Sequence, residues 1–98
     1  MIGCDVVKIN RFSKKLERWA LKVLTPLELE EYSKKTNKLE YLSGRWAAKE
    51  AIFKAAGAVN ISILTDNSGK PYVLGNDKLA VSISHEREYV FAVAFLNK

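Results

Sequence analysis

A chain of 98 residues, with 48% hydrophobic and 28% charged residues, has room for one hydrophobic core, so we expect a single domain over residues 1–98. Its net charge of +5 favours an anionic partner such as a nucleic acid, a phosphate-rich ligand, an acidic protein or a membrane surface. The single cysteine excludes an internal disulfide, no apolar run approaches the roughly twenty residues of a membrane helix, and no secretion-signal pattern is present, which together predict a cytoplasmic protein.

The first third of the chain is predicted to hold a strand followed by two helices. "MIGCDVVKI" is β-branched and apolar, which is typical of a strand, and Asp5 inside it must pair, bind a cation or reach solvent. "NRFSKKLERWALKVLT" carries apolar residues at helical spacing among basic ones, which predicts a basic amphipathic helix over 10–25. "TPLELEEYSKK" predicts a second helix, with Thr25 as N-cap, Pro26 in the first position and Glu28 completing a capping box.

The longest predicted helix runs from about Leu39 to Ala56 and is followed by Gly57, a residue typical of helix C-termini. Projected at about 100° per residue, it has one broad apolar face. That face consists of Ala47, Ala48, Ala51, Ile52 and Ala55. Trp46 and Phe53 interrupt the polar side, so we expect this helix to be covered on more than one side, with charged groups held in the seams.

Four charged residues of this helix form two pairs, each spaced by one turn. Arg45 and Lys49 share one flank, and Glu50 and Lys54 share another. On the residues alone, an ordinary helical ion pair explains Glu50 and Lys54. Asp5 and Glu50 could also act together as oxygen ligands for a hard cation such as magnesium.

The rest of the sequence predicts strands. "VNISILT" alternates, "DNSGKP" is a turn, and "PYVLG" is a short strand. "LAVSIS" and "YVFAVAFL" predict a hairpin whose loop is the four residues "HERE", with the only histidine, His85, at the junction of strand and turn. Both strands are nearly apolar on both faces, so we expect both faces of the hairpin to be covered.

Several blocks, in order, span nearly the whole chain: "GCDVV", "VLTPLELEEY", "YLSGRWAAKEAIFKAAG", "GKPYV" and "VSISHEREYVFAVAF". They resemble the signatures of the holo-acyl-carrier-protein synthases, the small single-domain type of 4′-phosphopantetheinyl transferase. The resemblance implies an α+β fold with a small, mostly antiparallel sheet and a long helix packed on it. It also implies Mg²⁺-dependent transfer of 4′-phosphopantetheine from coenzyme A to a serine of apo acyl carrier protein, with release of adenosine 3′,5′-bisphosphate.

The resemblance further implies roles for individual residues. Asp5 and Glu50 would hold Mg²⁺, and Glu50 would help to deprotonate the attacking serine, with Lys54 as a third catalytic residue. The phosphates of coenzyme A would be contacted by Arg45, Lys49, Lys54 and His85. The acidic carrier protein would dock on the basic segment at Arg11, Lys14, Lys15 and Arg18, which without the resemblance is explained as a solvated basic face.

The resemblance also implies a homotrimer with active sites between protomers, and it implies neither a nucleic-acid nor a membrane partner. Two other classes stay open on the residues alone: a basic module that binds RNA or DNA, and an interaction domain whose helix is merely salt-bridged. The chain departs from the family pattern at Phe53, where relatives often have serine, and at Glu86, where threonine is common. The segment after Gly57 is also shortened.

Overall fold

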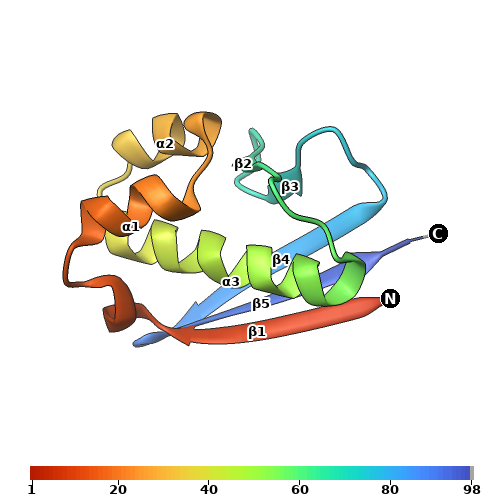
Figure 1. Cartoon of the computed structure of the whole chain (residues 1–98), viewed down its shortest axis with the longest axis horizontal. Coiled ribbons are helices and arrows are strands. Elements are labelled where there is room, and N and C mark those ends of the chain that lie inside the picture. Colours follow the sequence, from red (N-terminus) through yellow and green to blue (C-terminus); the bar gives the residue numbers. More distant parts are fainter. Residues whose placement is uncertain (98) are drawn as a thin grey trace.

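The computed structural model describes residues 1–97, in which a long helix packs on a three-stranded antiparallel sheet (Figure 1). The helix is α3 (Lys38–Ala56), and the sheet has the strand order β1 (Ile2–Lys8), β5 (Tyr89–Leu96), β4 (Leu79–Glu86). Because β1 pairs antiparallel with the central strand β5, the start of β1 and the end of β5 lie side by side at one end of the sheet. This arrangement confirms the expected α+β architecture.

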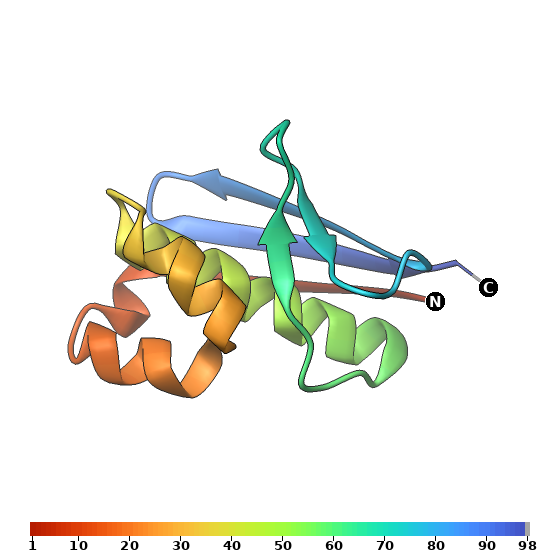
Figure 2. The same ribbon diagram turned by 90° about the horizontal axis from the view of Figure 1, so that it is seen from above.

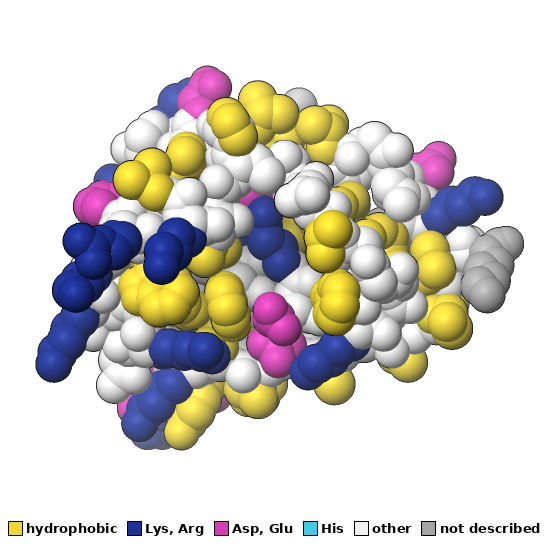
Figure 3. All heavy atoms as spheres, in the orientation of Figure 1, with side chains coloured by type: hydrophobic (Ala, Val, Ile, Leu, Met, Phe, Trp, Pro, Cys, Tyr) yellow, Lys and Arg dark blue, Asp and Glu magenta, His cyan; other side chains and the backbone are white. Residues whose placement is uncertain are grey.

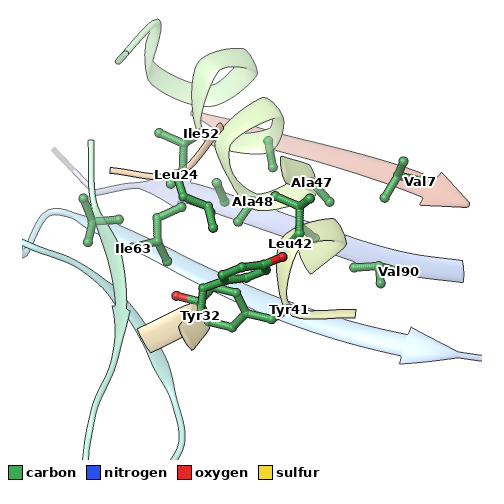
Figure 4. Close-up of a cluster of buried hydrophobic side chains, with 14 of the residues drawn as sticks. Val7, Leu24, Tyr32, Tyr41, Leu42, Ala47, Ala48, Ile52, Ile63 and Val90 are labelled. Atoms are coloured by element: carbon green, nitrogen blue, oxygen red, sulfur yellow. The ribbon is translucent and has the colours of Figure 1, made fainter. Parts of the chain in front are cut away.

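The core lies between the predicted apolar face of α3 and the sheet. All five residues of that face are no more than 2% exposed: Ala47, Ala48, Ala51, Ile52 and Ala55. Leu42 of α3 and Val90 of β5 extend the same layer, as Figure 4 shows. Alanines at the centre of this face allow the helix to approach the strands closely, because they add little beyond the backbone.

The closest approach of helix and strand occurs at Gly3. A Cβ atom at this position would clash with the carbonyl oxygen of Ala51 and lie 2.8 Å from the backbone nitrogen of Ala55. Side chains alternate between the two faces of a strand, so Gly3, Asp5 and Val7 all face α3. The aspartate in β1 is therefore directed to the helix rather than to open solvent.

The prediction of one continuous basic helix over 10–25 is wrong. The segment forms a short 3₁₀ turn, η1 (Ile9–Phe12), and a separate helix, α1 (Leu16–Val23). Lys15 between them adopts φ 60°, a left-handed conformation that a continuous right-handed helix cannot contain. The break accompanies the complete burial of Phe12, which anchors the turn to α3.

The other helix boundaries agree closely with the sequence. α2 (Pro26–Ser33) begins with the predicted capping box, in which Thr25 N donates to Glu28 Oε1 at 2.8 Å and Glu28 N donates to Thr25 Oγ1 at 3.4 Å. α3 ends at Gly57, whose φ of 68° is the left-handed conformation expected of a C-terminal glycine. Among the described residues, no helix is both long and apolar enough to cross a bilayer.

The segment after α3 forms less strand than predicted. Only the last three residues of "VNISILT" are in a strand, β2 (Ile63–Thr65), which pairs with β3 (Pro71–Val73) as a separate two-stranded ribbon (Figure 2). Asp66 shapes the turn of this ribbon, since its Oδ1 accepts hydrogen bonds from Ser68 N, Ser68 Oγ and Lys70 N at 2.7–2.9 Å. Residues 57–62 connect α3 to β2 without regular secondary structure.

The hairpin of β4 and β5 has a tighter turn than predicted. Glu86 pairs with Tyr89, so the loop has two residues rather than four, and Arg87 takes φ 58°, as a tight hairpin turn requires. The face of the sheet against α3 is apolar and covered. The outer face, which was also expected to be apolar and covered, is exposed, and β4 places Ser82 and Ser84 on it. The outer face exposes Ile2, Val6, Phe91, Val93 and Phe95.

Candidate functional site

Two residues predicted to act in catalysis, Asp5 and Lys54, are in direct contact. Lys54 Nζ on α3 lies 3.2 Å from Asp5 Oδ1 on β1 and donates to the carbonyl oxygen of Cys4 at 3.0 Å. The Asp5 side chain is 18% exposed and that of Lys54 is 52% exposed. The pair is therefore open to solvent on the lysine side, where a third N–H donor of the ammonium group is free to meet a ligand.

Glu50 stands one turn before Lys54 on α3 and is partly buried. Its carboxylate takes part in no hydrogen bond or ion pair with residues 1–97, and it lines a cavity of about 350 Å³ together with Lys22, Phe53 and Val59. A carboxylate without a partner at the wall of a cavity is available for a ligand.

Within the part of the chain that the structure describes, no three His, Cys, Asp or Glu side chains cluster closely enough to hold a metal ion by themselves. Mg²⁺ typically binds through one or two carboxylates and takes its other ligands from water and substrate phosphates. Asp5 and Glu50 lie on neighbouring elements, and Lys54 one turn from Glu50 contacts Asp5. Carboxylate oxygens are the donor type that this ion prefers, but the two side chains line different cavities of the single chain.

Arg45, predicted to contact phosphate, is used within the fold. Its side chain is 7% exposed; Nε donates to the Ile63 carbonyl oxygen at 2.8 Å, and Nη2 donates to Thr65 Oγ1 at 2.7 Å and to Glu31 Oε1 at 3.3 Å. Its guanidinium also lies over the ring of Tyr41, with Cζ 4.5 Å from the centroid. Arg45 therefore ties α3 to α2 and β2.

The same network changes the acidity of its members. Burial would raise the pKa of the Glu31 carboxyl, but hydrogen bonds from Thr65 N and Tyr41 Oη, together with the charge of Arg45, hold that pKa below its usual value. Burial and the neighbouring Glu31 raise the pKa of Tyr41, although Arg45 opposes the shift. Glu31 thus stays ionised and Tyr41 stays protonated at neutral pH.

Lys49, also predicted to contact phosphate, pairs with a buried acid. Lys49 Nζ lies 2.7 Å from Oε1 of Glu28 and 2.9 Å from the carbonyl oxygen of Ile61, and Glu28 has no exposed surface. The other oxygen of Glu28 accepts from Ile63 N at 2.7 Å. The sequence identified Glu28 only through the capping box; its contacts with α3 and β2 had no local signal.

His85 lies apart from the Asp5–Lys54 pair. It is on β4, the edge strand opposite β1, and its Nε2 is 3.3 Å from Glu40 Oε1. It lines a second cavity of about 350 Å³ together with Arg45 and Gly69 of the "GKP" turn. Of the residues predicted to contact coenzyme A, Arg45 and His85 therefore share one cavity, whereas Lys49 and Lys54 line two others.

The basic residues predicted to dock the carrier protein are all exposed, and they gather at the end of the molecule that carries η1 and α1 (Figure 3). They are Arg11, Lys14, Lys15 and Arg18. None forms an ion pair with an acid of residues 1–97, which leaves their charges available to an acidic partner. One of them, Arg11, lies over the ring of Trp46, a contact that the sequence did not reveal.

Comparison with known proteins gives a consistent result. A family model described as the 4′-phosphopantetheinyl transferase superfamily matches residues 1–94. Two relatives are named holo-[acyl-carrier-protein] synthase: that of Halothermothrix orenii is 39% identical over 97% of this chain and 93% of its own length, and that of Mycoplasmopsis pulmonis is 40% identical over 100% and 89%.

Two solved structures of holo-[acyl-carrier-protein] synthases are also similar. The Neisseria meningitidis structure has a TM-score of 0.88 and 30% identity and covers 99% of this chain and 97% of that one. The Bacillus anthracis structure, in complex with CoA (3′,5′-ADP), has a TM-score of 0.85 and 32% identity, with 97% and 93% covered.

Proposed function

The chain belongs to the 4′-phosphopantetheinyl transferase superfamily, and from this premise we propose that it is a holo-acyl-carrier-protein synthase. It transfers 4′-phosphopantetheine from coenzyme A to a serine of apo acyl carrier protein and releases adenosine 3′,5′-bisphosphate. The observation that carries this proposal is similarity to named synthases at 39% and 40% identity over 97% and 100% of the chain. Membership of this family argues against the two other hypotheses that the residues alone left open, a nucleic-acid-binding module and an interaction domain.

The reaction attacks a pyrophosphate, so its transition state is favoured by exact positioning of the reactants and by cations near the phosphate oxygens. We propose that Asp5 and Glu50 hold Mg²⁺, which supplies positive charge to those oxygens when bound. The partner-free carboxylate of Glu50 supports this role. It also supports Glu50 as the base that accepts the proton of the attacking serine hydroxyl.

Lys54 and His85 are the better supported of the residues proposed to contact the phosphates of coenzyme A. Both are about half exposed, with side-chain exposures of 52% and 56%, and both face cavities. Arg45 and Lys49 stay predictions as phosphate ligands, since internal partners take much of their donor capacity. Their present contacts support a role in holding α3 against α2 and β2.

We further propose that the enzyme is a homotrimer with active sites between protomers. The uncovered outer face of the sheet supports this, because Phe91, Val93 and Phe95 are 40–48% exposed there. The trimer is also supported by the separation of the His85 cavity from Asp5 and Lys54, since a neighbouring subunit could place its own His85 cavity beside the Asp5–Lys54 pair. The lone cysteine suits the reducing cytoplasm, where we place the protein.

Docking of the acidic carrier protein is proposed at the exposed basic residues of η1 and α1. Exposed charges of this kind steer an oppositely charged partner and set its orientation. Their lack of acidic partners within residues 1–97 supports the proposal.

Transfer is tested directly by incubating the full chain with coenzyme A, Mg²⁺ and apo acyl carrier protein and then measuring the mass of the carrier. We expect a gain equal to one phosphopantetheine arm, and none in a carrier whose acceptor serine is replaced by alanine. An unchanged carrier mass at high enzyme concentration, with a known synthase active in parallel, would refute the function.

A further inference from the structure

The guanidinium of Arg11 lies over an aromatic ring of another element. Its Cζ lies 5.0 Å from the ring centroid of Trp46 on α3, and 5.7 Å from that of its neighbour Phe12. At these distances a guanidinium is attracted to the negative face of the ring. Arg11 makes no side-chain hydrogen bond or ion pair with residues 1–97, so its N–H donors are free for a partner.

The indole that carries Arg11 is itself fixed by packing. Trp46 lies 5.5 Å from Phe12 and 6.2 Å from Trp19 between ring centroids, and Phe12 is completely buried. The Nε1 atom of Trp46 is buried and has no hydrogen-bond partner among the described residues. An unpaired buried N–H is unfavourable, and leucine or phenylalanine would avoid it, so stability alone does not account for tryptophan here.

Trp46 also links the basic surface to the catalytic helix. It lies one turn before Glu50 on α3, whereas Arg11 belongs to a four-residue 3₁₀ turn that ends before the left-handed Lys15. Such a short element does not by itself hold a long side chain in one place. The two ring contacts are therefore what orients the guanidinium relative to Glu50.

We infer that Trp46 is a positioning residue. Its indole face holds the Arg11 guanidinium so that the free N–H donors meet a carboxylate of the acidic carrier protein in a fixed register with Glu50. This inference rests on the proposed function, because it takes Arg11 to be a docking residue for that protein.

A double-mutant cycle tests the inference in the full-length enzyme with Trp46→Leu, Arg11→Gln and the double variant. The apparent KM for carrier protein, measured at saturating coenzyme A, should rise about 3- to 10-fold in each single variant. The KM of the double variant for carrier protein should exceed that of Arg11→Gln by no more than about 2-fold, because without Arg11 the ring of Trp46 has no cation to position. The KM for coenzyme A should change by less than about 2-fold throughout.

Two further variants make the test specific. Trp46→Phe keeps an aromatic face, so its KM for carrier protein should lie between those of the wild type and Trp46→Leu. Arg18→Gln removes a neighbouring cation that is not stacked on Trp46, so in that background Trp46→Leu should keep its full effect. If Trp46→Leu does not fold, as judged by its thermal unfolding, Trp46→Phe replaces it in both cycles.

The inference is overturned if the substitution at Trp46 raises the KM for carrier protein by the same factor with and without Arg11. It is also overturned if the KM values for both substrates rise in parallel, which would mark Trp46 as a packing residue only. These outcomes differ from failure of the proposed function, in which the wild-type enzyme itself transfers nothing.

Discussion

Lys49 Nζ lies 2.7 Å from Oε1 of Glu28, a carboxylate with no exposed surface. Lys54, on the same helix, instead reaches Asp5 at 3.2 Å with a half-exposed side chain. Two lysines of one signature motif are thus in opposite environments. Lys49 pairs with a buried acid between α2, α3 and β2, whereas Lys54 lies at the candidate active site.

This contrast predicts opposite results for the same substitution. Lys49→Met leaves Glu28 buried without its cation, so we expect the free energy of unfolding to fall by about 3–5 kcal/mol. Lys54→Met should cost less than about 1 kcal/mol, because its ion pair is partly exposed, but it should greatly slow transfer. Urea unfolding and initial rates measure both quantities. Equal stability of the two variants would contradict the assigned environments.

The two carboxylates are expected to be needed for catalysis and not for folding. Glu50→Gln and Asp5→Asn should each slow transfer by about 10²- to 10⁴-fold, the range for loss of a general base or a positioned charge. Thermal unfolding should stay close to that of the wild type, since Glu50 has no partner among residues 1–97 and the ion pair of Asp5 with Lys54 is partly exposed. Near-full turnover of either variant at limiting Mg²⁺ would show that the residue does not hold the metal.

The sequence predicted the elements well where local signals were strong. The capping box at Thr25, the glycine after α3 and the apolar face of α3 all depend on residues close together in the chain, and the structure confirms them. The single helix over 10–25 and the four-residue hairpin loop were wrong. A residue with positive φ is present in both places: Lys15 interrupts the helix, and Arg87 forms the two-residue turn of the hairpin. Neither residue is glycine, so the sequence carried no local signal for either conformation.

Candidate site residues could be named from the sequence, but their contacts could not. The residues alone marked Asp5 and Glu50 as possible cation ligands, helix geometry gave the one-turn spacing of Glu50 and Lys54, and the resemblance assigned all three their catalytic roles. The burial of Arg45 and Lys49 against acids of α2 was missed, because it depends on how α2 docks on α3 and β2. Periodicity within one helix carries no information about such docking.

The lowered pKa of Glu31 predicts how stability depends on pH. A carboxyl whose pKa is lower in the folded state stabilises that state at pH values above its ordinary pKa of 4.5. This contribution is lost as the pH falls through the lower pKa of the folded state. Glu31→Gln should therefore cost about 1–3 kcal/mol at pH 7, and the difference from the wild type should shrink below about pH 4. Denaturant unfolding between pH 2.5 and 8 provides the measurement. A constant difference across this range would count against the assigned contacts.

The outer face of the sheet is expected to form the subunit interface. Light scattering should give a mass of about three times the 11.0 kDa chain at micromolar concentration. Phe91→Glu places a charge on that face and should yield monomers with little activity. Leu21→Glu is a matched control, because Leu21 is an exposed apolar residue of α1, and it should keep the wild-type mass. A wild-type monomer would refute the trimer.

Reversing charges on the basic segment should weaken docking of the carrier protein alone. Arg11→Glu with Lys15→Glu should raise the KM for carrier protein and flatten its dependence on ionic strength, since exposed charges are screened over roughly 8 Å at physiological salt. The KM for coenzyme A should hardly change. Lys34→Glu with Lys78→Glu changes the net charge equally, away from η1 and α1, and should have little effect. Equal effects of the two double variants would mean that only net charge matters.

Gly3 sets a one-sided limit on the geometry around Asp5. A Cβ atom at this position would clash with the carbonyl oxygen of Ala51, so no residue introduced there allows the strand to move nearer to the helix. Any side chain at position 3 can only force the two elements apart, and Asp5, two residues along on the same face, would move with the strand. Substitution at this position can therefore increase the separation of Asp5 from α3, but it cannot decrease it.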